Sequence, residues 1–259
     1  MSPYLAFRST FLSYDETIER ILAAIADGRR CQHVALNVAK LVNARTDDEL
    51  DRDIRASDIV GVDGMGIVSA LRLLGHPISQ RVAGADLFES LMAACAAHGL
   101  RPYLLGATPE VLASTKLKLA ERYPNLVLAG SHHGYFKSEQ EKSVCDLIRA
   151  SGAHCLFIAM PTPRKERFMA RHRDNLGVPF VMGVGGTYDV VAGHVKRAPA
   201  LVQSFGLEWA YRMLSGAAPA RGKISPHQSH LRRAAGPRIA AASHSRRAAC
   251  QSDFGVTRS

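Results

Sequence analysis

The sequence predicts an α/β protein built on a Rossmann-like, mostly parallel sheet of about six strands, with helices on both faces. Short apolar runs of strand length alternate along the chain with longer stretches of helical periodicity, and this alternation indicates a parallel sheet with helical crossovers. Nearly every apolar run is also followed directly by polar or glycine-rich residues. We therefore expect one domain over residues 1–216 and an irregular basic tail over residues 217–259.

The predicted strands are short apolar runs bounded by glycine, proline or polar residues. In chain order they are His33–Leu36, Ile59–Val62, Pro102–Leu105, Leu126–Ala129, Cys155–Ala159 and Phe180–Val184. Because right-handed crossovers connect parallel strands, we expect a helix after most of them.

Amphipathic segments between these runs are the predicted helices. The clearest begins at Thr108 and Pro109, because a hydroxyl cap followed by proline at the first helical position is typical of a helix start. The segment TDDELDRDIRASD predicts a charged helix. Its Asp51 and Asp53 imitate the DxD pair with which many sugar transferases hold a metal, but helical positions two apart point in different directions. We expect a solvent-facing helix surface there and no metal site.

Composition excludes several classes of protein. No segment approaches the roughly 20 continuous apolar residues of a membrane-spanning helix, and the N-terminus lacks the pattern of a signal peptide. The five cysteines are scattered without CxxC spacing, so we expect reduced thiols in a cytoplasmic protein. Of the net charge of +10, most lies in residues 217–259, which hold eight basic residues and one acidic residue.

Polar and glycine residues follow the predicted strands at their carboxyl ends, where the catalytic and binding residues of parallel sheets usually lie. The carboxyl ends of parallel strands lie along one edge of the sheet, so these residues converge on one crevice. Helix N-termini at that edge favour anions, and basic side chains add full positive charges. A diphosphate is the natural ligand for this set, which comprises Asn37, Asp63, Gly106 and Gly185 at strand ends and the cations Arg81, Arg164 and Lys165.

Asp63 is the strongest candidate catalytic residue. It lies in ASDIVGVDGMGIV, one residue past an apolar run and inside a glycine-spaced turn. A carboxylate at the end of a strand can act as a general base. The alternative is that Asp63 only caps the helix that starts near Met65. The chain has no GxxxxGK[ST] loop and no GxGxxG between a strand and a helix, and we expect no cofactor.

Eight stretches along the chain together form a specific pattern. They are LNVAKLVNA, DIVGVDGMGIV, RVAGADLFESL, YLLGATPEV, GSHHGYF, PTPRKERF, GVGGTYDVVAGHVKRAP and GLEWAYRML. In this order, from about Val34 to Leu214, they resemble the WecG/TagA/CpsF glycosyltransferase family (glycosyltransferase family 26). The resemblance implies an inverting enzyme that moves a sugar from a UDP-sugar donor to a polyprenyl-diphosphate-linked saccharide, for a bacterial cell-surface polymer or exopolysaccharide. It also implies a cytoplasmic protein associated peripherally with the inner membrane.

The resemblance assigns roles to individual residues. Asp63 occupies the position of the family's proposed base, and Asn37 and Arg81 occupy those of substrate-binding groups. Arg81 has an alternative role as an ion-pair partner of Asp86. Asp189 matches an aspartate expected to contact the nucleotide base, and its alternative role is to cap the next turn.

Other positions refine or depart from the family pattern. Lys165 stands where many members have glutamine, and a lysine there can still bind a diphosphate as a point charge. Ala35 stands where threonine is common. Both departures favour the exopolysaccharide branch, which is similar to xanthan-type glucosyltransferases. We interpret His132 and His133 as part of the crevice wall rather than as metal ligands.

The tail departs most from the family, whose members continue into a basic amphipathic segment that is thought to touch the membrane and that ends in a pattern like Arg-Tyr-Leu-x-x-Asn-x-x-Phe. Codons for residues 223–228 (KISPHQ), read one nucleotide later, permit Arg-Tyr-Leu-x-(Thr/Ile)-Asn. We therefore expect a frameshift between about Ser215 and Lys223. We expect the basic tail to retain an attraction to anionic lipid. For the oligomeric state, we expect a homodimer rather than a monomer.

Two other functions stay open from the sequence. If the altered tail has removed a needed segment, the protein is a catalytically impaired remnant of the family. The excess of basic residues also fits a nucleic-acid-binding protein. However, the body of the chain is only mildly basic and lacks aromatics interleaved with arginine or lysine. We therefore rank the transferase first and expect no nucleic-acid partner.

Overall fold

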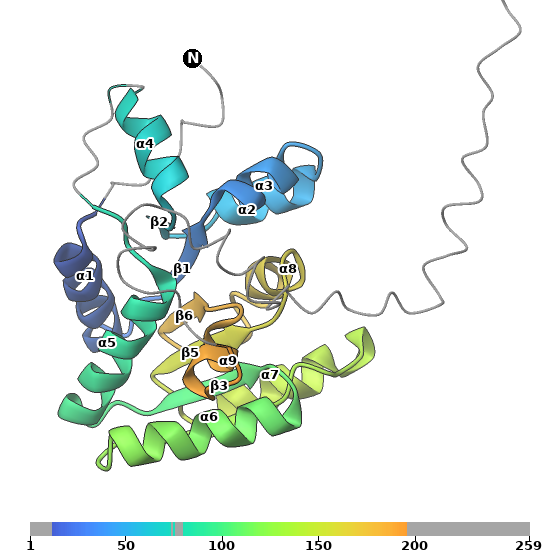
Figure 1. The fold of residues 1–259 in the computed structure, drawn as a ribbon. Helices are drawn as coiled ribbons and strands as arrows, with labels where there is room; N and C mark the ends of the chain where they lie inside the picture. Colours follow the sequence, from blue (N-terminus) through green and yellow to red (C-terminus); the bar gives the residue numbers. More distant parts are fainter. Residues whose placement is uncertain (1–11, 74, 76–79, 196–259) are drawn as a thin grey trace, which may run out of the picture. The chain divides into compact units, whose positions relative to one another are not determined.

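The computed structural model describes residues 12–73, 75 and 80–195, and in them it confirms the predicted α/β fold (Figure 1). Six strands form one sheet in the order β2-β1-β6-β5-β3-β4, and every adjacent pair is parallel. The strands are β1 (Cys31–Leu36), β2 (Ile59–Val62), β3 (Pro102–Gly106), β4 (Gly130–His132), β5 (Cys155–Ala159) and β6 (Phe180–Gly183).

One predicted strand is wrong. The apolar run Leu126–Ala129 is not a strand, because β4 begins at Gly130, which pairs with Tyr103 of β3. The leucines of that run instead pack against the core as partly buried residues of the connection. A Cβ at Gly130 would lie 2.6 Å from the Tyr103 ring. The missing side chain therefore lets this edge strand approach its neighbour.

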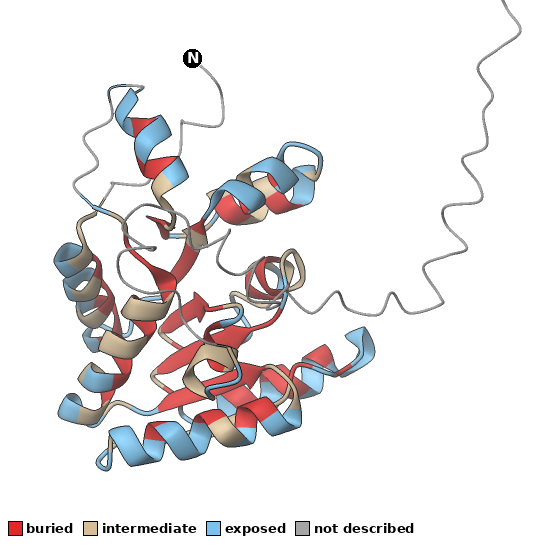
Figure 2. Ribbon diagram, viewed as in Figure 1, coloured by how far each residue is buried: buried red, intermediate tan, exposed pale blue. Residues whose placement is uncertain are grey.

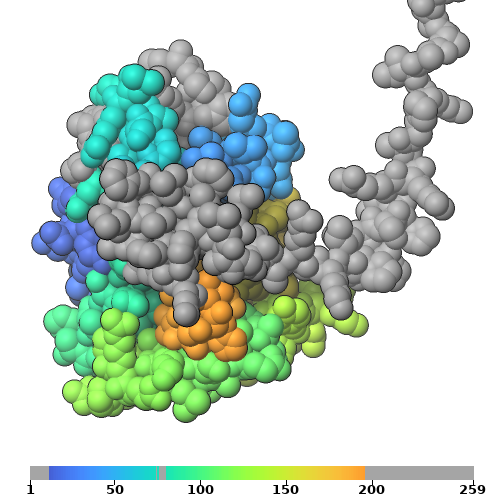
Figure 3. Space-filling view, viewed as in Figure 1, coloured from blue at the N-terminus to red at the C-terminus, as the bar shows by residue number. Residues whose placement is uncertain are grey.

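Helices cover both faces of the sheet, as predicted, and Figure 2 shows the strands buried between the two helical layers. One face packs against α2, α3, α4, α7 and α8, and the other against α1, α5, α6 and α9. On the second face α9 contacts α5 and α6, and Figure 3 shows its orange atoms against their green ones. The helices are α1 (Tyr14–Ala26), α2 (Val38–Ala44), α3 (Asp48–Arg55), α4 (Met65–Leu73), α5 (Gly84–His98), α6 (Pro109–Arg122), α7 (Glu141–Ala150), α8 (Arg164–Arg171) and α9 (Thr187–Val191).

Helix starts follow the local sequence. The Thr108 hydroxyl caps α6 by accepting the Val111 N–H at 3.2 Å, as predicted. The charged segment forms α3, also as predicted, but its surface is only partly solvated. Asp51 pairs with Arg55 at 2.7 Å, and Asp53 is half-buried. Burial raises the pKa of Asp53.

The described residues bear on two expectations from composition, which concern membrane-spanning helices and the state of the cysteines. None of their helices combines the length and the apolar character needed to cross a membrane. The four cysteines among them are all buried free thiols, at Cys31, Cys95, Cys145 and Cys155. Cys250 and the predicted tail over residues 217–259 lie outside the described residues.

Candidate active site

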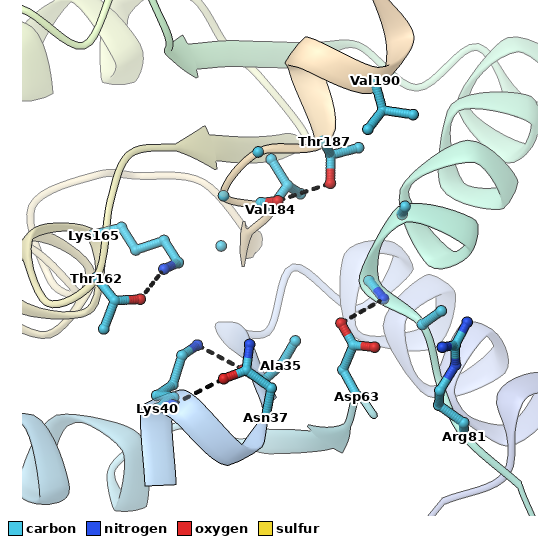
Figure 4. Close-up of a pocket in the computed structure, with 16 residues that line it drawn as sticks. Ala35, Asn37, Lys40, Asp63, Arg81, Thr162, Lys165, Val184, Thr187 and Val190 are labelled. Carbon is cyan, nitrogen blue, oxygen red and sulfur yellow. Dashed lines mark hydrogen bonds between the residues drawn. The ribbon is translucent and has the colours of Figure 1, made fainter. Parts of the chain in front are cut away.

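A pocket of about 180 Å³ opens at the carboxyl edge of the sheet. It is lined by residues in and after the carboxyl ends of β1 and β6, by residues that follow β2 and β5, and by the segment that enters α5 (Figure 4). β1 and β6 are neighbours in the sheet, yet the helices that follow them, α2 and α9, pack on opposite faces. A crevice opens where connections diverge in this way, and in doubly wound sheets ligands bind there.

Asp63 lies directly after β2, where its backbone N–H donates to the Leu36 carbonyl oxygen at 2.9 Å. Its half-buried carboxylate accepts the N–H of Gly84, the first residue of α5, at 3.4 Å (Figure 4). The positive end of the α5 dipole favours the ionised carboxylate, which is the state that a general base requires. The helix in this contact is α5, whereas the capping interpretation concerned the helix that begins at Met65.

Asn37 lies directly after β1 and caps α2. Its Oδ1 accepts the backbone N–H of Lys40 at 2.9 Å. Because this bond uses the amide oxygen, the two amide N–H donors are left for the pocket, which Asn37 also lines. Asn37 therefore both starts a helix and presents a donor suited to phosphate or sugar oxygens.

Lys165 belongs to a buried cluster of charges on one side of the pocket. Its Nζ donates to Glu166 Oε1 at 2.8 Å and to Thr162 Oγ1 at 2.5 Å. The Nζ of Lys40 donates to the same Oε1 at 2.9 Å and to the Ala35 carbonyl oxygen at 2.6 Å. The two lysines thus come from α2 and α8 and meet at one carboxylate oxygen.

Electrostatics keep this cluster charged at neutral pH. Burial, followed by the positive charge of Lys40, lowers the pKa of Lys165 to about 8. Burial raises the pKa of Glu166, but Lys165 and Lys40 more than offset this effect and bring it to about 2. Two ammonium groups therefore share one carboxylate, and the cluster carries a net positive charge.

The pocket brings together five of the eight predicted site residues, namely Asn37, Asp63, Arg81, Lys165 and Gly185. Arg81 lies on the side of Asp63 (Figure 4). Its alternative partner, Asp86, is in the first turn of α5. The lining does not include the other three predicted residues, Arg164, Asp189 and Gly106.

Arg164 has a structural role in this geometry. Its guanidinium donates to the carbonyl oxygens of Gly134 and Phe136 at 2.8 and 2.6 Å, and it lies over the Phe136 ring, 4.7 Å from the centroid. The side chain therefore holds the segment after β4 against α8. That Arg164 also binds substrate stays a prediction.

Gly106 and Asp189 also have local roles. Gly106 has a φ of +117°, and a Cβ there would lie 2.3 Å from the Ala159 carbonyl oxygen, so the close approach of β3 and β5 requires glycine. Asp189 lies in the first turn of α9, where its carbonyl oxygen accepts the N–H groups of His194 and Val195 at 2.9 and 3.1 Å. Substrate contacts by these two residues stay predictions.

Sequence reasoning missed Lys40 and Thr162 as pocket residues. A signal for Lys40 was present. It lies four residues before Ala44 in α2, and both residues are buried on the same side of the helix. A lysine on the core-facing side of a short helix indicates a buried partner, but the sequence does not show that Glu166 is that partner.

Metal ligands were not expected, and residues 12–73, 75 and 80–195 contain no cluster of three side chains placed to hold an ion. His132 lies in β4, and its Nδ1 is 2.8 Å from the carbonyl oxygen of His133. The centroids of the two rings lie 4.7 Å apart, and the ring planes are tilted by 45°. Neither histidine lines the pocket, so the interpretation that they form its wall is not supported by this geometry.

A known family model matches most of the chain. The family model described as "Glycosyl transferase WecG/TagA/CpsF family" matches residues 4–221. This range includes the whole sheet and every residue that lines the pocket. The chain therefore belongs to the WecG/TagA/CpsF family of glycosyltransferases.

Proposed function

We propose that the protein is an inverting glycosyltransferase that moves a sugar from a UDP-sugar to a polyprenyl-diphosphate-linked saccharide in exopolysaccharide or other cell-surface polymer synthesis. Membership of the family supports glycosyl transfer of this kind. The observation that carries the proposal is one pocket with the Asp63 carboxylate on one side and the ammonium groups of Lys40 and Lys165 on the other (Figure 4). A base and a cationic wall are the groups that displacement of a nucleoside diphosphate requires.

The proposed reaction is a single displacement. The acceptor hydroxyl oxygen attacks C1 of the donor sugar as the bond from C1 to the diphosphate oxygen breaks. Asp63 takes the hydroxyl proton, and the bonding electrons leave with UDP. Attack and departure on opposite faces of C1 invert that centre. A positioned base contributes about 10²–10⁴-fold, and Lys165 and Arg81 offset the charge that develops on the leaving diphosphate.

A comparison of Asp63→Asn with wild type tests the role of the base. The amide preserves the size of the side chain but cannot take the proton, so UDP release with a polyprenyl-diphosphate-sugar acceptor should fall about 10²–10⁴-fold. Asp146→Asn is the matched control, because Asp146 is an exposed residue of α7 with a surface ion pair to Arg149. Undiminished release by the Asp63 variant would remove Asp63 from the mechanism.

The proposed reaction needs no divalent cation, because ammonium and guanidinium groups supply the positive charge beside the diphosphate. Turnover should therefore persist in the presence of EDTA. A strict dependence on added Mg²⁺ or Mn²⁺ would contradict this part of the proposal.

The lipid carrier of the proposed acceptor places the reaction at the inner face of the cytoplasmic membrane. We propose that the protein is cytoplasmic and binds that surface peripherally as a homodimer. Basic residues near anionic lipid contribute roughly 1 kcal/mol each. Co-sedimentation with anionic and neutral vesicles tests the membrane contact, and sedimentation velocity tests the dimer.

The donor sugar is the finer question. Lys165 and Ala35 both line the pocket, and both depart from the common family residues, which supports a donor of the exopolysaccharide branch such as UDP-glucose. A panel of UDP-sugars tests this choice. If wild-type protein binds UDP but turns over no member of the panel, the chain is an impaired remnant and the transferase proposal fails.

A further inference from the structure

We infer that Lys40 and Lys165 form a two-lysine subsite for a diphosphate group, with Glu166 as the residue that positions both ammonium groups. The inference deepens the proposed function, on which the identity of the diphosphate-bearing ligand rests. It makes the two lysines one subsite and adds Glu166 as the residue that positions them. Figure 4 shows the two lysines on the side of the pocket opposite Asp63 and Arg81.

The count of hydrogen-bond donors is the first argument. An ammonium group has three N–H donors. In the described residues Lys40 uses one on Ala35 and one on Glu166, and Lys165 uses one on Thr162 and one on Glu166. Each lysine therefore keeps one donor, and both side chains line the pocket. Two such donors match the oxygens of one diphosphate.

The count of charges is the second argument. The side chains of Lys40, Lys165 and Glu166 are 5%, 7% and 0% exposed. One lysine suffices to neutralise the carboxylate and to tie α2 to α8. The second lysine leaves a net positive charge in a nearly water-free wall, which is unfavourable unless an anion offsets it. A purely structural ion pair does not account for the second lysine.

The arrangement around the carboxylate is the third argument. Glu166 Oε1 accepts from both ammonium groups and from Thr162 Oγ1, the last at 3.3 Å. Glu166 Oε2 is buried and has no hydrogen-bond partner in the described part of the chain. If the two lysines served only to provide hydrogen bonds for the Glu166 carboxylate, we would expect donors to both Oε1 and Oε2. Here the shared oxygen brings both ammonium groups to one place.

The diphosphate has two possible sources in the proposed reaction, the nucleotide donor and the lipid-linked acceptor. Both present the same charged oxygens to the lysines. They differ in what is attached, a nucleoside in one case and an isoprenoid chain in the other. The ligands of the test therefore include the bare group and one soluble compound of each kind.

Isothermal titration calorimetry with inorganic pyrophosphate tests the subsite directly. Lys40→Met and Lys165→Gln should each weaken pyrophosphate binding about tenfold or more, since each removes one charge-assisted hydrogen bond. Each variant leaves Glu166 with one lysine partner, so both should fold, and thermal unfolding curves check this. Lys118→Met is the matched control, because Lys118 pairs with Glu121 on the surface of α6, and its affinity should equal that of wild type.

Parallel titrations identify the source. If UDP binding weakens with pyrophosphate binding and geranyl diphosphate binding does not, the subsite belongs to the donor, and the reverse pattern assigns it to the acceptor. The inference would be overturned if both folded variants bound pyrophosphate as tightly as wild type does. It would also be overturned if wild type did not bind pyrophosphate. Because this readout needs no turnover, an inactive wild type that still binds pyrophosphate through both lysines would refute the proposed function alone.

Discussion

Lys40 of α2 and Lys165 of α8 donate to the same oxygen of Glu166, at 2.9 and 2.8 Å. This contact joins the helix that follows β1 to the helix that follows β5. Both lysines also line the pocket. The same three side chains therefore affect both the stability of the fold and the charge that a ligand meets, and variants can separate the two effects.

Glu166→Gln should destabilise the protein by about 3–5 kcal/mol, because two ammonium groups would remain buried without a carboxylate. Denaturant titration measures the change in the free energy of unfolding. Combining this substitution with Lys165→Gln should recover part of the loss, since one buried charge is then removed. A double variant less stable than Glu166→Gln would show that repulsion between the lysines is not the cause.

The stability difference between wild type and Glu166→Gln should also depend on acid pH. The pKa of Glu166 is lowered from 4.5 to about 2 in the folded protein, so the folded state favours the ionised form. This contribution is fully present above about pH 4.5 and is lost as pH falls towards 2. The free energies of unfolding of wild type and Glu166→Gln, measured from pH 6 to pH 2.5, should therefore approach each other. A difference that stays constant over this range would contradict the prediction.

If the subsite takes the donor diphosphate, affinity for UDP should fall as pH rises through about 8. The pKa of Lys165 is about 8 without ligand, and only its protonated form attracts a diphosphate. Lys40→Met should move this fall to higher pH, because the charge of Lys40 lowers the pKa of Lys165. Glu166, Asp63 and Arg81 are the other charged groups beside Lys165 or in the same pocket. Calorimetry from pH 7 to 9 measures the effect, and an unchanged fall in Lys165→Gln would exclude Lys165 as its cause.

The two arginines should differ in their effects. Arg81→Met should mainly raise the KM for the donor, because Arg81 lines the pocket. Arg164→Met should mainly lower the free energy of unfolding, by about 1–3 kcal/mol, because it removes bonds to two carbonyl oxygens. Steady-state kinetics with thermal unfolding of both variants measures this contrast. A raised KM for Arg164→Met without loss of stability would contradict this contrast and would support Arg164 as a substrate-binding residue.

Resequencing of the gene tests the frameshift. The family match ends at residue 221, inside the interval expected from residues 215–223. The codons of residues 223–228 should spell Arg-Tyr-Leu-x-(Thr/Ile)-Asn one nucleotide later. Codons that cannot supply Tyr and Asn in that frame would exclude the hypothesis. Restoring the other frame should increase binding to anionic vesicles if the replaced segment contacts the membrane.

Local patterns predicted most of the sheet. The runs Ile59–Val62 and Cys155–Ala159 match β2 and β5 residue for residue, because buried parallel strands require continuous apolar sequence. The same pattern did not predict β4, because Gly130–His132 is a short edge strand with half-buried residues. Its position depends on the fit of Gly130 against Tyr103, which is a contact between distant parts of the chain.

The site was predictable where it depends on strand ends. Asn37, Asp63 and Gly185 lie in the pocket because the carboxyl ends of parallel strands share one edge. Lys40 was missed because its partner, Glu166 of α8, is distant in the sequence, and the helical spacing of α2 does not identify that partner. Arg164 was predicted from its charge and its position after the fifth strand. Its guanidinium donates to the carbonyl oxygens of Gly134 and Phe136, and a contact with substrate stays a prediction.

The central place of β6 has a consequence for biosynthesis. Among the described residues β6 is the last strand in chain order, yet it lies between β1 and β5. Until residues 180–183 leave the ribosome, the β2-β1 pair and the β5-β3-β4 group have no shared neighbour, and a nascent chain presents two open edges that invite misassociation. Translation that stops before this strand yields no half-functional enzyme, because the crevice between β1 and β6 does not exist until the sheet is joined.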